Sequence, residues 1–309
     1  MSGLLRRQVA DYLRVRRSLG YRLVEHERFL NQFMDYLEQT QATTITAENA
    51  LAWATLPIGA NPRWHGARLS AVRGFAAWAQ AFDPDIQVPP AGVLPMRTTR
   101  ATPYLYTGDQ IRALMDAAAG LAPTVRSATF QTLIGLLSVT GMRAGEAVRV
   151  DVTDLDLDAG TLTVKGTKFG KSRLLPLHAT AVEELRGYLT VRSTAALPGT
   201  TALLVSVAGT RLTYDNAQGV FKKLTAQAGI AARSTGCRPR MHDLRHSFAV
   251  NTLLDAYRGG GDVGERLPLL STYLGHAEPA NTYWYLHAAP ELMALAADRL
   301  NTYDAEDQR

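Results

Sequence analysis

The 309-residue sequence contains one cysteine, Cys237, which excludes a disulfide within the chain and every zinc site built from several cysteines. No stretch approaches the roughly 20 uninterrupted apolar residues of a membrane span, and residues 1–7 lack the apolar core of a secretory signal. No P-loop pattern and no cluster of paired carboxylates is present. These absences predict a cytoplasmic protein without a membrane partner, and they give no sign of ATP-driven or metal-dependent chemistry.

Lysine is missing from the first 100 residues, where 12 arginines face 8 acidic residues. This first third therefore carries most of the formal net charge of +5. A guanidinium group offers a planar fork of donors that suits phosphate contact, whereas a lysine offers a point charge. A GC-rich genome would favour arginine codons as well, so the charge permits an anionic partner without requiring one.

The spacing of apolar residues divides the chain into two parts. Between residues 10 and 81 they recur at helical intervals, and four helices fit the pattern. Five prolines follow between residues 83 and 103, where periodicity is lost, and this composition indicates an extended connector. We predict a helical domain over residues 1–88, a proline-rich linker over 89–103 and a second domain over 104–309 that ends in a helical tail.

The second part alternates between helices and one short pair of strands. Residues 160–164 and 172–177 are predicted strands, joined by a turn rich in glycine and lysine, and Pro176 confines the second strand to an edge or an end. Helical patterns surround them, over residues 107–119, 128–139, 179–191, 214–228, 241–256, 265–274 and 281–287.

Three motifs in this part carry reactive residue types. They are Thr-Gly-Met-Arg-Ala-Gly-Glu at 140–146, His-Asp-Leu-Arg-His at 242–246, and Leu-Gly-His at 274–276, which Tyr285 follows nine residues later. Together, and in this order, they resemble the tyrosine recombinases, or phage integrase family, over residues 107–290. The resemblance implies a mainly α fold with a small antiparallel β-sheet. It also implies a helical core-binding, SAM-like domain at the N-terminus and a mixed α/β catalytic domain, which together clamp duplex DNA.

Two arginines of these motifs suit a reaction at a phosphodiester. In-line attack on phosphorus places extra negative charge on the equatorial oxygens, and positioned cations stabilise that state. Arg143 and Arg245 are the candidates for the non-bridging oxygens, with Glu146 as the group that orients Arg143. The plainer alternative for each arginine is an ion pair or a solvated surface position.

Two histidines accompany Arg245 within one helical turn on either side. His242 lies three residues before it and shares its helix face, so one helix would present a proton-exchanging imidazole together with a phosphate clamp. His242 and His246 nearly form the zinc motif HExxH, but Asp243 stands where that motif has Glu, and no third ligand has a telling spacing. We therefore predict no metal.

Tyr285 is the predicted nucleophile, because its distance from His276 matches the family spacing. A tyrosine hydroxyl has a lower pKa and a longer reach than that of serine. Tyr273 and Tyr283 are alternatives on proximity alone, although Tyr283 would point to roughly the opposite helix face. The resemblance implies that His276 hydrogen-bonds a phosphate oxygen; a buried structural histidine is the alternative.

The leaving 5′ oxygen needs a general acid, which in the family is a lysine on the β-hairpin turn. Three lysines occupy this segment here, at positions 165, 168 and 171. Counting back from the second strand matches Lys168 to the family position, and Lys171 stays open.

The resemblance implies a site-specific recombinase or integrase that cuts and rejoins DNA through a 3′-phosphotyrosine intermediate. ATP, metal and other cofactors are not needed, because the phosphotyrosine keeps the bond energy. The implied partners are double-stranded DNA at specific sites, three further copies in a synaptic homotetramer, and an accessory or sister recombinase. A type IB topoisomerase-like enzyme, a DNA-binding protein without catalysis and a zinc hydrolase are the competing functions. The motifs do not distinguish phage integration, transposition, cassette movement and chromosome resolution as the biological role. They also leave open whether the C-terminal tail docks on its own subunit or on a neighbouring one.

Overall fold

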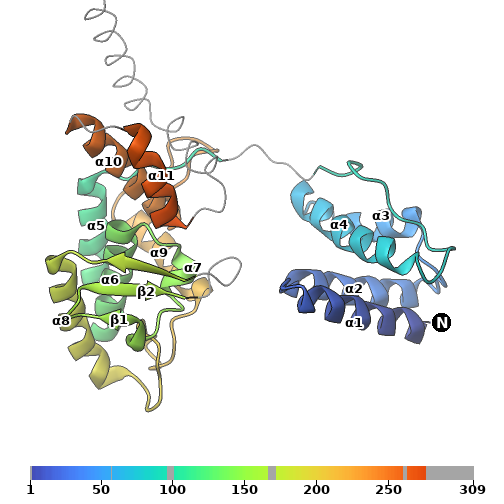
Figure 1. Ribbon diagram of the computed structural model, residues 1–309, viewed down its shortest axis with the longest axis horizontal. Coiled ribbons are helices and arrows are strands. Elements are labelled where there is room, and N and C mark those ends of the chain that lie inside the picture. Colours follow the sequence, from blue (N-terminus) through green and yellow to red (C-terminus); the bar gives the residue numbers. More distant parts are fainter. Residues whose placement is uncertain (1, 57, 96–100, 166–171, 260–262, 276–309) are drawn as a thin grey trace, which may run out of the picture. The chain divides into compact units, whose positions relative to one another are not determined.

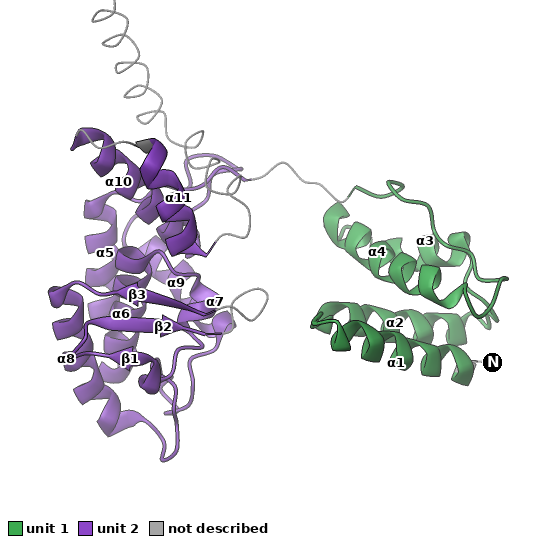
Figure 2. Cartoon of the chain, in the orientation of Figure 1, with its two compact units in different colours: residues 1–100 green, residues 101–309 purple. Residues whose placement is uncertain are grey.

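A computed structural model of the chain describes all residues except 1, 57, 96–100, 166–171, 260–262 and 276–309. The chain forms two compact units, residues 1–100 and residues 101–309 (Figure 2). Each unit has its own hydrophobic core. The linker bounds of 89–103 stay a prediction.

The first unit contains the four predicted helices, α1 (Ser2–Ser18), α2 (Val24–Gln39), α3 (Ala47–Thr55) and α4 (Pro62–Ala79) (Figure 1). Local signals explain two of the starts. Thr46 and Asn49 form a reciprocal capping box at α3, while Asn61 caps α4 and Pro62 occupies its first turn. Apolar residues from all four helices fill one core, with Phe33 and Phe75 fully buried.

Several arginines of the first unit are already engaged within it. Arg6 pairs with both Asp35 and Glu38 at 2.6 and 2.7 Å. Arg68 is buried, with its guanidinium 3.7 Å from the ring centroid of Trp53, and it donates a hydrogen bond of 2.8 Å to the Trp53 carbonyl. The arginine content of this unit therefore serves packing and ion pairing as well as any contact with phosphate.

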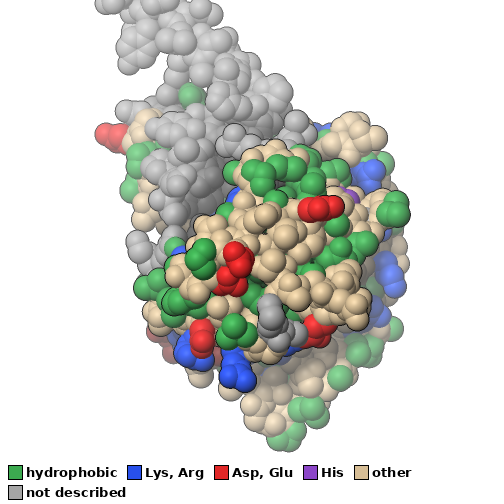
Figure 3. Space-filling model, turned by 90° about the vertical axis from the view of Figure 1, so that its right-hand side faces the viewer, with side chains coloured by type: hydrophobic (Ala, Val, Ile, Leu, Met, Phe, Trp, Pro, Cys, Tyr) green, Lys and Arg blue, Asp and Glu red, His purple; other side chains and the backbone are tan. Residues whose placement is uncertain are grey.

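The face of the molecule in Figure 3 is mixed in character. Figure 3 shows one face, on which hydrophobic side chains are dispersed among polar ones and both acidic and basic groups are present. Such mixing is ordinary for a protein surface, so this face does not by itself mark a binding site.

The second unit is built on one long apolar helix, α6 (Thr124–Thr140), which packs against helices before and after it in sequence. Its other helices are α5 (Gly108–Ala119), α7 (Ala144–Ala147), η1 (Val152–Asp154), α8 (Ala179–Ala195), α9 (Tyr214–Gln227), α10 (Asp243–Arg258) and α11 (Val263–Leu274). Six of the predicted helices of this part are confirmed. The one expected at 281–287 lies outside the described residues.

A small antiparallel sheet (Figure 1) contributes Leu162, Val164 and Leu175 to the same core cluster as the buried residues of α6. Its strands are β1 (Leu155–Asp156), β2 (Thr161–Val164) and β3 (Arg173–Pro176), in that order across the sheet. Leu162 pairs with Leu175 and both are fully buried, so alternate residues of β2 and β3 face the core. The sequence did not indicate β1, because two residues carry no periodicity. Pro176 ends the edge strand, as predicted.

The predicted fold class is thereby confirmed, since the chain is mainly helical with a small antiparallel sheet. Within the described part of the chain, no helix combines the length and the apolar character that a membrane crossing requires.

Candidate active site

The first motif turns the chain sharply at the end of α6. Gly141 has a φ of +59°, and a Cβ atom at this position would lie 2.3 Å from the Phe248 ring. Both the backbone conformation and the space therefore demand glycine. The turn directs the chain into α7, with Arg143 at the N-cap position of that short helix.

Arg143 and Glu146 contact each other, as the sequence predicted. Arg143 Nη1 donates to Glu146 Oε1 at 2.8 Å, and the Arg143 amide donates to Oε2 at 3.0 Å. The Glu146 side chain is 3% exposed, whereas that of Arg143 is 37% exposed. A buried carboxylate thus orients an arginine that still reaches the surface.

Arg173, at the start of β3, is a second partner of Glu146 that the sequence did not reveal. Its Nη2 lies 2.7 Å from Glu146 Oε2, and its side chain is 12% exposed. Burial raises the pKa of Glu146, but hydrogen bonds from Arg173 and from Arg143 outweigh this effect and lower the pKa to about 2. Glu146 is therefore ionised at neutral pH.

Arg245, on α10, is almost completely buried. Its Nη1 donates to the Gly141 carbonyl at 2.8 Å, and its Nη2 donates to the Leu274 carbonyl at 2.9 Å. One guanidinium thus connects the end of α6 with the end of α11. These bonds contradict the alternative of a solvated surface arginine, because the group lies inside the unit.

The end of α11 is the point at which the arginines meet. Arg143 Nη2 lies 3.4 Å from the Gly275 carbonyl, and the Arg173 guanidinium lies so close to Gly275 that a Cβ there would be 3.1 Å from Arg173 Nη1. The last carbonyls of a helix carry partial negative charge and have no partner within the helix, so cations stabilise them. Gly275 has a φ of +69° and directly precedes His276.

His242 lies just before α10, among these cations. Burial, followed by the positive charges of Arg245, Arg240 and Arg143, lowers its pKa to about 4. The imidazole is therefore neutral at neutral pH and can accept a proton, as a general base must. The sequence predicted that His242 and Arg245 share a helix face; in the structure His242 is the N-cap residue, one position before α10 begins.

Asp243, between these two residues, has a structural task. It is fully buried, and Arg240 binds it through Nη2 at 2.8 Å and through Nε at 3.0 Å. The His242 and His246 rings are 4.9 Å apart and nearly perpendicular. Within the described ranges, no group of three or more His, Cys, Asp and Glu side chains has the arrangement of a metal site.

Of the remaining predicted residues, Lys168, Lys171, His276, Tyr283 and Tyr285 lie outside the described residues, as does the tail. Two competitors are described. Lys165 forms an ion pair with the buried Asp154, which raises the pKa of the lysine. Tyr273 stacks on Phe248 with ring centroids 5.7 Å apart, and burial raises the pKa of its hydroxyl.

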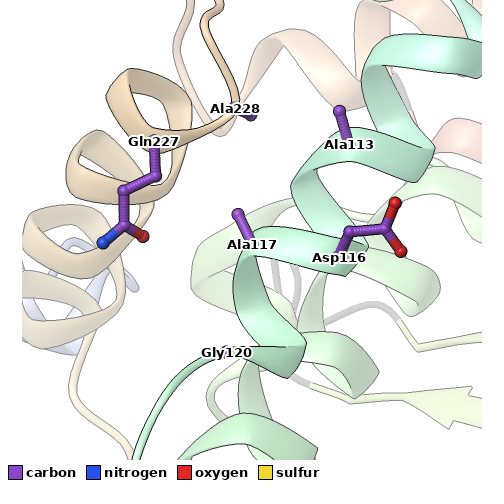
Figure 4. A pocket seen from close by; sticks show the side chains of 6 residues that line it. All are labelled: Ala113, Asp116, Ala117, Gly120, Gln227 and Ala228. Carbon is purple, nitrogen blue, oxygen red and sulfur yellow. The ribbon is translucent and has the colours of Figure 1, made fainter.

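A cavity of about 480 Å³ lies between α5 and α9 (Figure 4). Its walls consist of small residues, with one carboxylate and one amide, and are formed by Ala113, Asp116, Ala117, Gly120, Gln227 and Ala228. These groups offer no cation to a phosphate. The cavity is therefore not the candidate active site.

Comparison with known proteins agrees with the fold and with the motifs. Residues 105–291 match the model of the phage integrase family. The chain is 44% identical over 302 residues to the putative integrase/recombinase y4rB of Sinorhizobium fredii, with 96% of both chains covered. It is 35% identical over 242 residues to the tyrosine recombinase XerD of Mycobacterium tuberculosis, with 75% of this chain and 73% of that one covered.

Among solved structures, the fold is similar to that of the Tn1549 transposon integrase in complex with a circular intermediate DNA. The TM-score is 0.64 at 18% identity, with 95% of this chain and 98% of that one covered. The chain therefore belongs to the phage integrase family, and it is an enzyme of the tyrosine recombinase type.

Proposed function

We propose that this protein cuts and rejoins duplex DNA at specific sites through a covalent phosphotyrosine. The observation that carries the proposal is the convergence of Arg143 and Arg245 at the end of α11, with the neutral His242 in their field. Two cations directed at one point match the charge that develops on a phosphodiester under in-line attack.

In the proposed reaction, the Tyr285 hydroxyl oxygen attacks the scissile phosphorus and the bond to the 5′ oxygen breaks. A 3′-phosphotyrosine and a free 5′-hydroxyl result. Arg143, Arg245 and His276 stabilise the non-bridging oxygens, while His242 accepts the phenolic proton. A partner strand's 5′-hydroxyl then attacks the phosphotyrosine, so the number of phosphodiester bonds is conserved and neither ATP nor a cofactor is consumed.

The proton for the leaving 5′ oxygen comes from a lysine on the β2–β3 turn. The ion pair with Asp154 makes Lys165 a poor candidate, because a carboxylate partner stabilises the protonated amine and opposes its release of a proton. Lys168 is our choice and Lys171 is the alternative; residues 166–171 connect the strands.

We propose double-stranded DNA as the partner, bound by both units, and a homotetramer as the synaptic assembly. Support comes from the relatives, since the solved Tn1549 integrase holds transposon DNA and a lambda integrase structure is a dimer on a core site. A cytoplasmic location and an accessory or sister recombinase belong to the same proposal.

Covalent capture tests this function. The protein is incubated with duplex fragments from both sides of its own gene, denatured in detergent, and the attached DNA is sequenced. Tyr285→Phe is the test variant, and Tyr273→Phe is the matched control.

Capture by the wild type and by Tyr273→Phe, together with its loss in Tyr285→Phe, is expected, and the captured sequence identifies the site. Loss in Tyr273→Phe alone would move the nucleophile to Tyr273. Absence of any capture contradicts the proposed chemistry, and relaxation of supercoiled plasmids without a preferred site would favour the topoisomerase-like alternative.

A further inference from the structure

Glu146 lies between two guanidinium groups, and this arrangement has a consequence for catalysis. The carboxylate lies 2.8 Å from Arg143 Nη1 and 2.7 Å from Arg173 Nη2. One negative and two positive charges leave a net charge of +1 in this cluster. Arg143 is the more exposed of the two arginines, at 37% against 12% for Arg173.

Arg143 has to serve two anions, Glu146 and the scissile phosphate. A pair consisting only of Arg143 and Glu146 would be neutral, and a neutral pair attracts a phosphate weakly. The second cation restores the surplus positive charge without occupying the side of Arg143 that faces the surface. The fixed Glu146 still holds Arg143 in a single orientation, which limits the reorganisation required when charge develops.

The position of Arg173 also connects two structural elements. Arg173 is the first residue of β3 and pairs with Val164 of β2, so in sequence it closely follows the lysine-bearing segment that joins these two strands. The guanidinium also lies close to Gly275, the residue before His276, since a Cβ built there would be 3.1 Å from Arg173 Nη1. Arg173 thus follows the lysine-bearing segment in sequence, pairs with the orienting carboxylate and lies close to the end of α11.

We propose that Arg173 is a positioning residue for DNA cleavage, which keeps Glu146 ionised and leaves the charge of Arg143 available to the scissile phosphate. This inference rests on the proposed function, because it assigns Arg173 a part in the same site.

The inference predicts a specific dependence on pH. Burial has the largest influence on the pKa of Glu146 and raises it, and the hydrogen bond from Arg173 is the largest of the influences that lower it. Removal of Arg173 therefore raises this pKa from about 2. As the pH falls, Glu146 would then take up a proton, and Arg143 would lose its acceptor.

The test is single-turnover formation of the covalent complex on a nicked duplex that carries the captured site, measured from about pH 5 to pH 8. The variants are Arg173→Gln and Arg173→Lys. Arg211→Gln is the control, because Arg211 forms a more exposed ion pair in the same unit with another carboxylate, Asp151, and donates to the carbonyls of Val148 and Val150. Thermal unfolding and DNA affinity are measured alongside.

For Arg173→Gln we expect a cleavage rate about tenfold lower at pH 7, with a further fall toward the acid end of the range, and a smaller change in DNA affinity. Arg173→Lys should recover most of the rate and the wild-type profile, because it keeps the charge. Arg211→Gln should show the wild-type profile. An Arg173→Gln variant with the wild-type rate and profile overturns the inference. A loss of cleavage rate that is independent of pH and equal in Arg173→Gln and Arg173→Lys also overturns the inference, since that result indicates a purely structural role.

If Arg173→Gln alone does not fold, Glu146→Gln and Glu146→Gln/Arg173→Gln replace it, because the double variant removes the buried carboxylate together with its partner. If Arg173 acts through Glu146, the double variant should cleave less than about threefold more slowly than Glu146→Gln. A cleavage rate about tenfold lower than that of Glu146→Gln overturns the inference. Absence of Tyr285-dependent capture in the wild type instead overturns the proposed function itself, so the two failures are distinguishable.

Discussion

At the scale of single residues, the environment decides whether a buried arginine stabilises a hydrophobic core or belongs to the proposed site. Arg68 and Arg245 are both buried, yet Arg68 lies against the rings of Trp53 and Trp64, while Arg245 donates to the carbonyls of Gly141 and Leu274. The first arrangement stabilises a helical core through cation–π contact, and the second joins the ends of two helices at the proposed site. Residue type and burial are alike, but the second arginine belongs to the proposed site and the first does not.

The lowered pKa of His242 predicts acid sensitivity of the second unit. The pKa falls from an ordinary 6.5 to about 4 in the folded chain, so below about pH 6.5 the unfolded chain binds a proton that the folded chain does not. The stability that the neutral imidazole contributes is complete above pH 6.5 and is lost as the pH falls toward 4. His242→Gln should therefore lose less thermal stability than the wild type between pH 7 and about pH 5, as measured by scanning calorimetry.

His178→Asn is the control for this experiment, since His178 is exposed and asparagine preserves its N-cap role at α8. A His242→Gln profile parallel to that of the wild type would show that other groups cause the acid sensitivity.

At the scale of elements, the site is assembled from the ends of helices and strands. α6 ends at Gly141, α7 begins after Arg143, β3 begins with Arg173, and α11 ends at Leu274. Ends of elements expose unpaired backbone groups, and Arg143 and Arg245 satisfy the carbonyls of Gly275 and Leu274. The same bonds that stabilise the fold therefore hold the two guanidinium groups in place, which links stability to activity.

Gly141→Ala should disrupt this assembly. Alanine at a φ of +59° is strained, and its Cβ would overlap the Phe248 ring. We expect a loss of about 2 kcal/mol or more in the free energy of unfolding. A loss of cleavage should accompany it, because Gly141 provides a carbonyl to Arg245.

Gly135→Ala is the matched control, since Gly135 lies within α6 and a Cβ there has no neighbour within 4 Å. This variant should be more stable than the wild type by about 0.5–1 kcal/mol in urea unfolding, because alanine favours the helix. Equal free energies of unfolding for the two variants would contradict the conclusion that position 141 requires glycine.

At the scale of the whole molecule, the chain consists of two units with separate cores. The core of the first unit draws only on residues up to Leu94, and that of the second begins at Tyr104. Separate cores permit each unit to fold as a domain of its own.

Residues 1–95 expressed alone should therefore fold. We expect a helical circular dichroism spectrum and a single cooperative thermal transition, because the four helices bury their apolar faces against one another. A gradual loss of helical signal without a transition would show that this unit depends on the remainder of the chain.

The sequence by itself determined the fold class, the ten longer helices of the described residues, the strands β2 and β3, and the contact between Arg143 and Glu146, because helical spacing and turn residues are local. It did not indicate the short helices α7 and η1. The order of the motifs likewise identified the family. Only the tertiary structure revealed Arg173 as the second partner of Glu146 and the end of α11 as the meeting point of three guanidinium groups. Such contacts join residues up to 132 positions apart, as between Arg143 and Gly275, and no local pattern encodes them. The protonation of His242 depends likewise on burial and on cations from other segments, so it follows from the packing of the chain and not from the motif in which the residue stands.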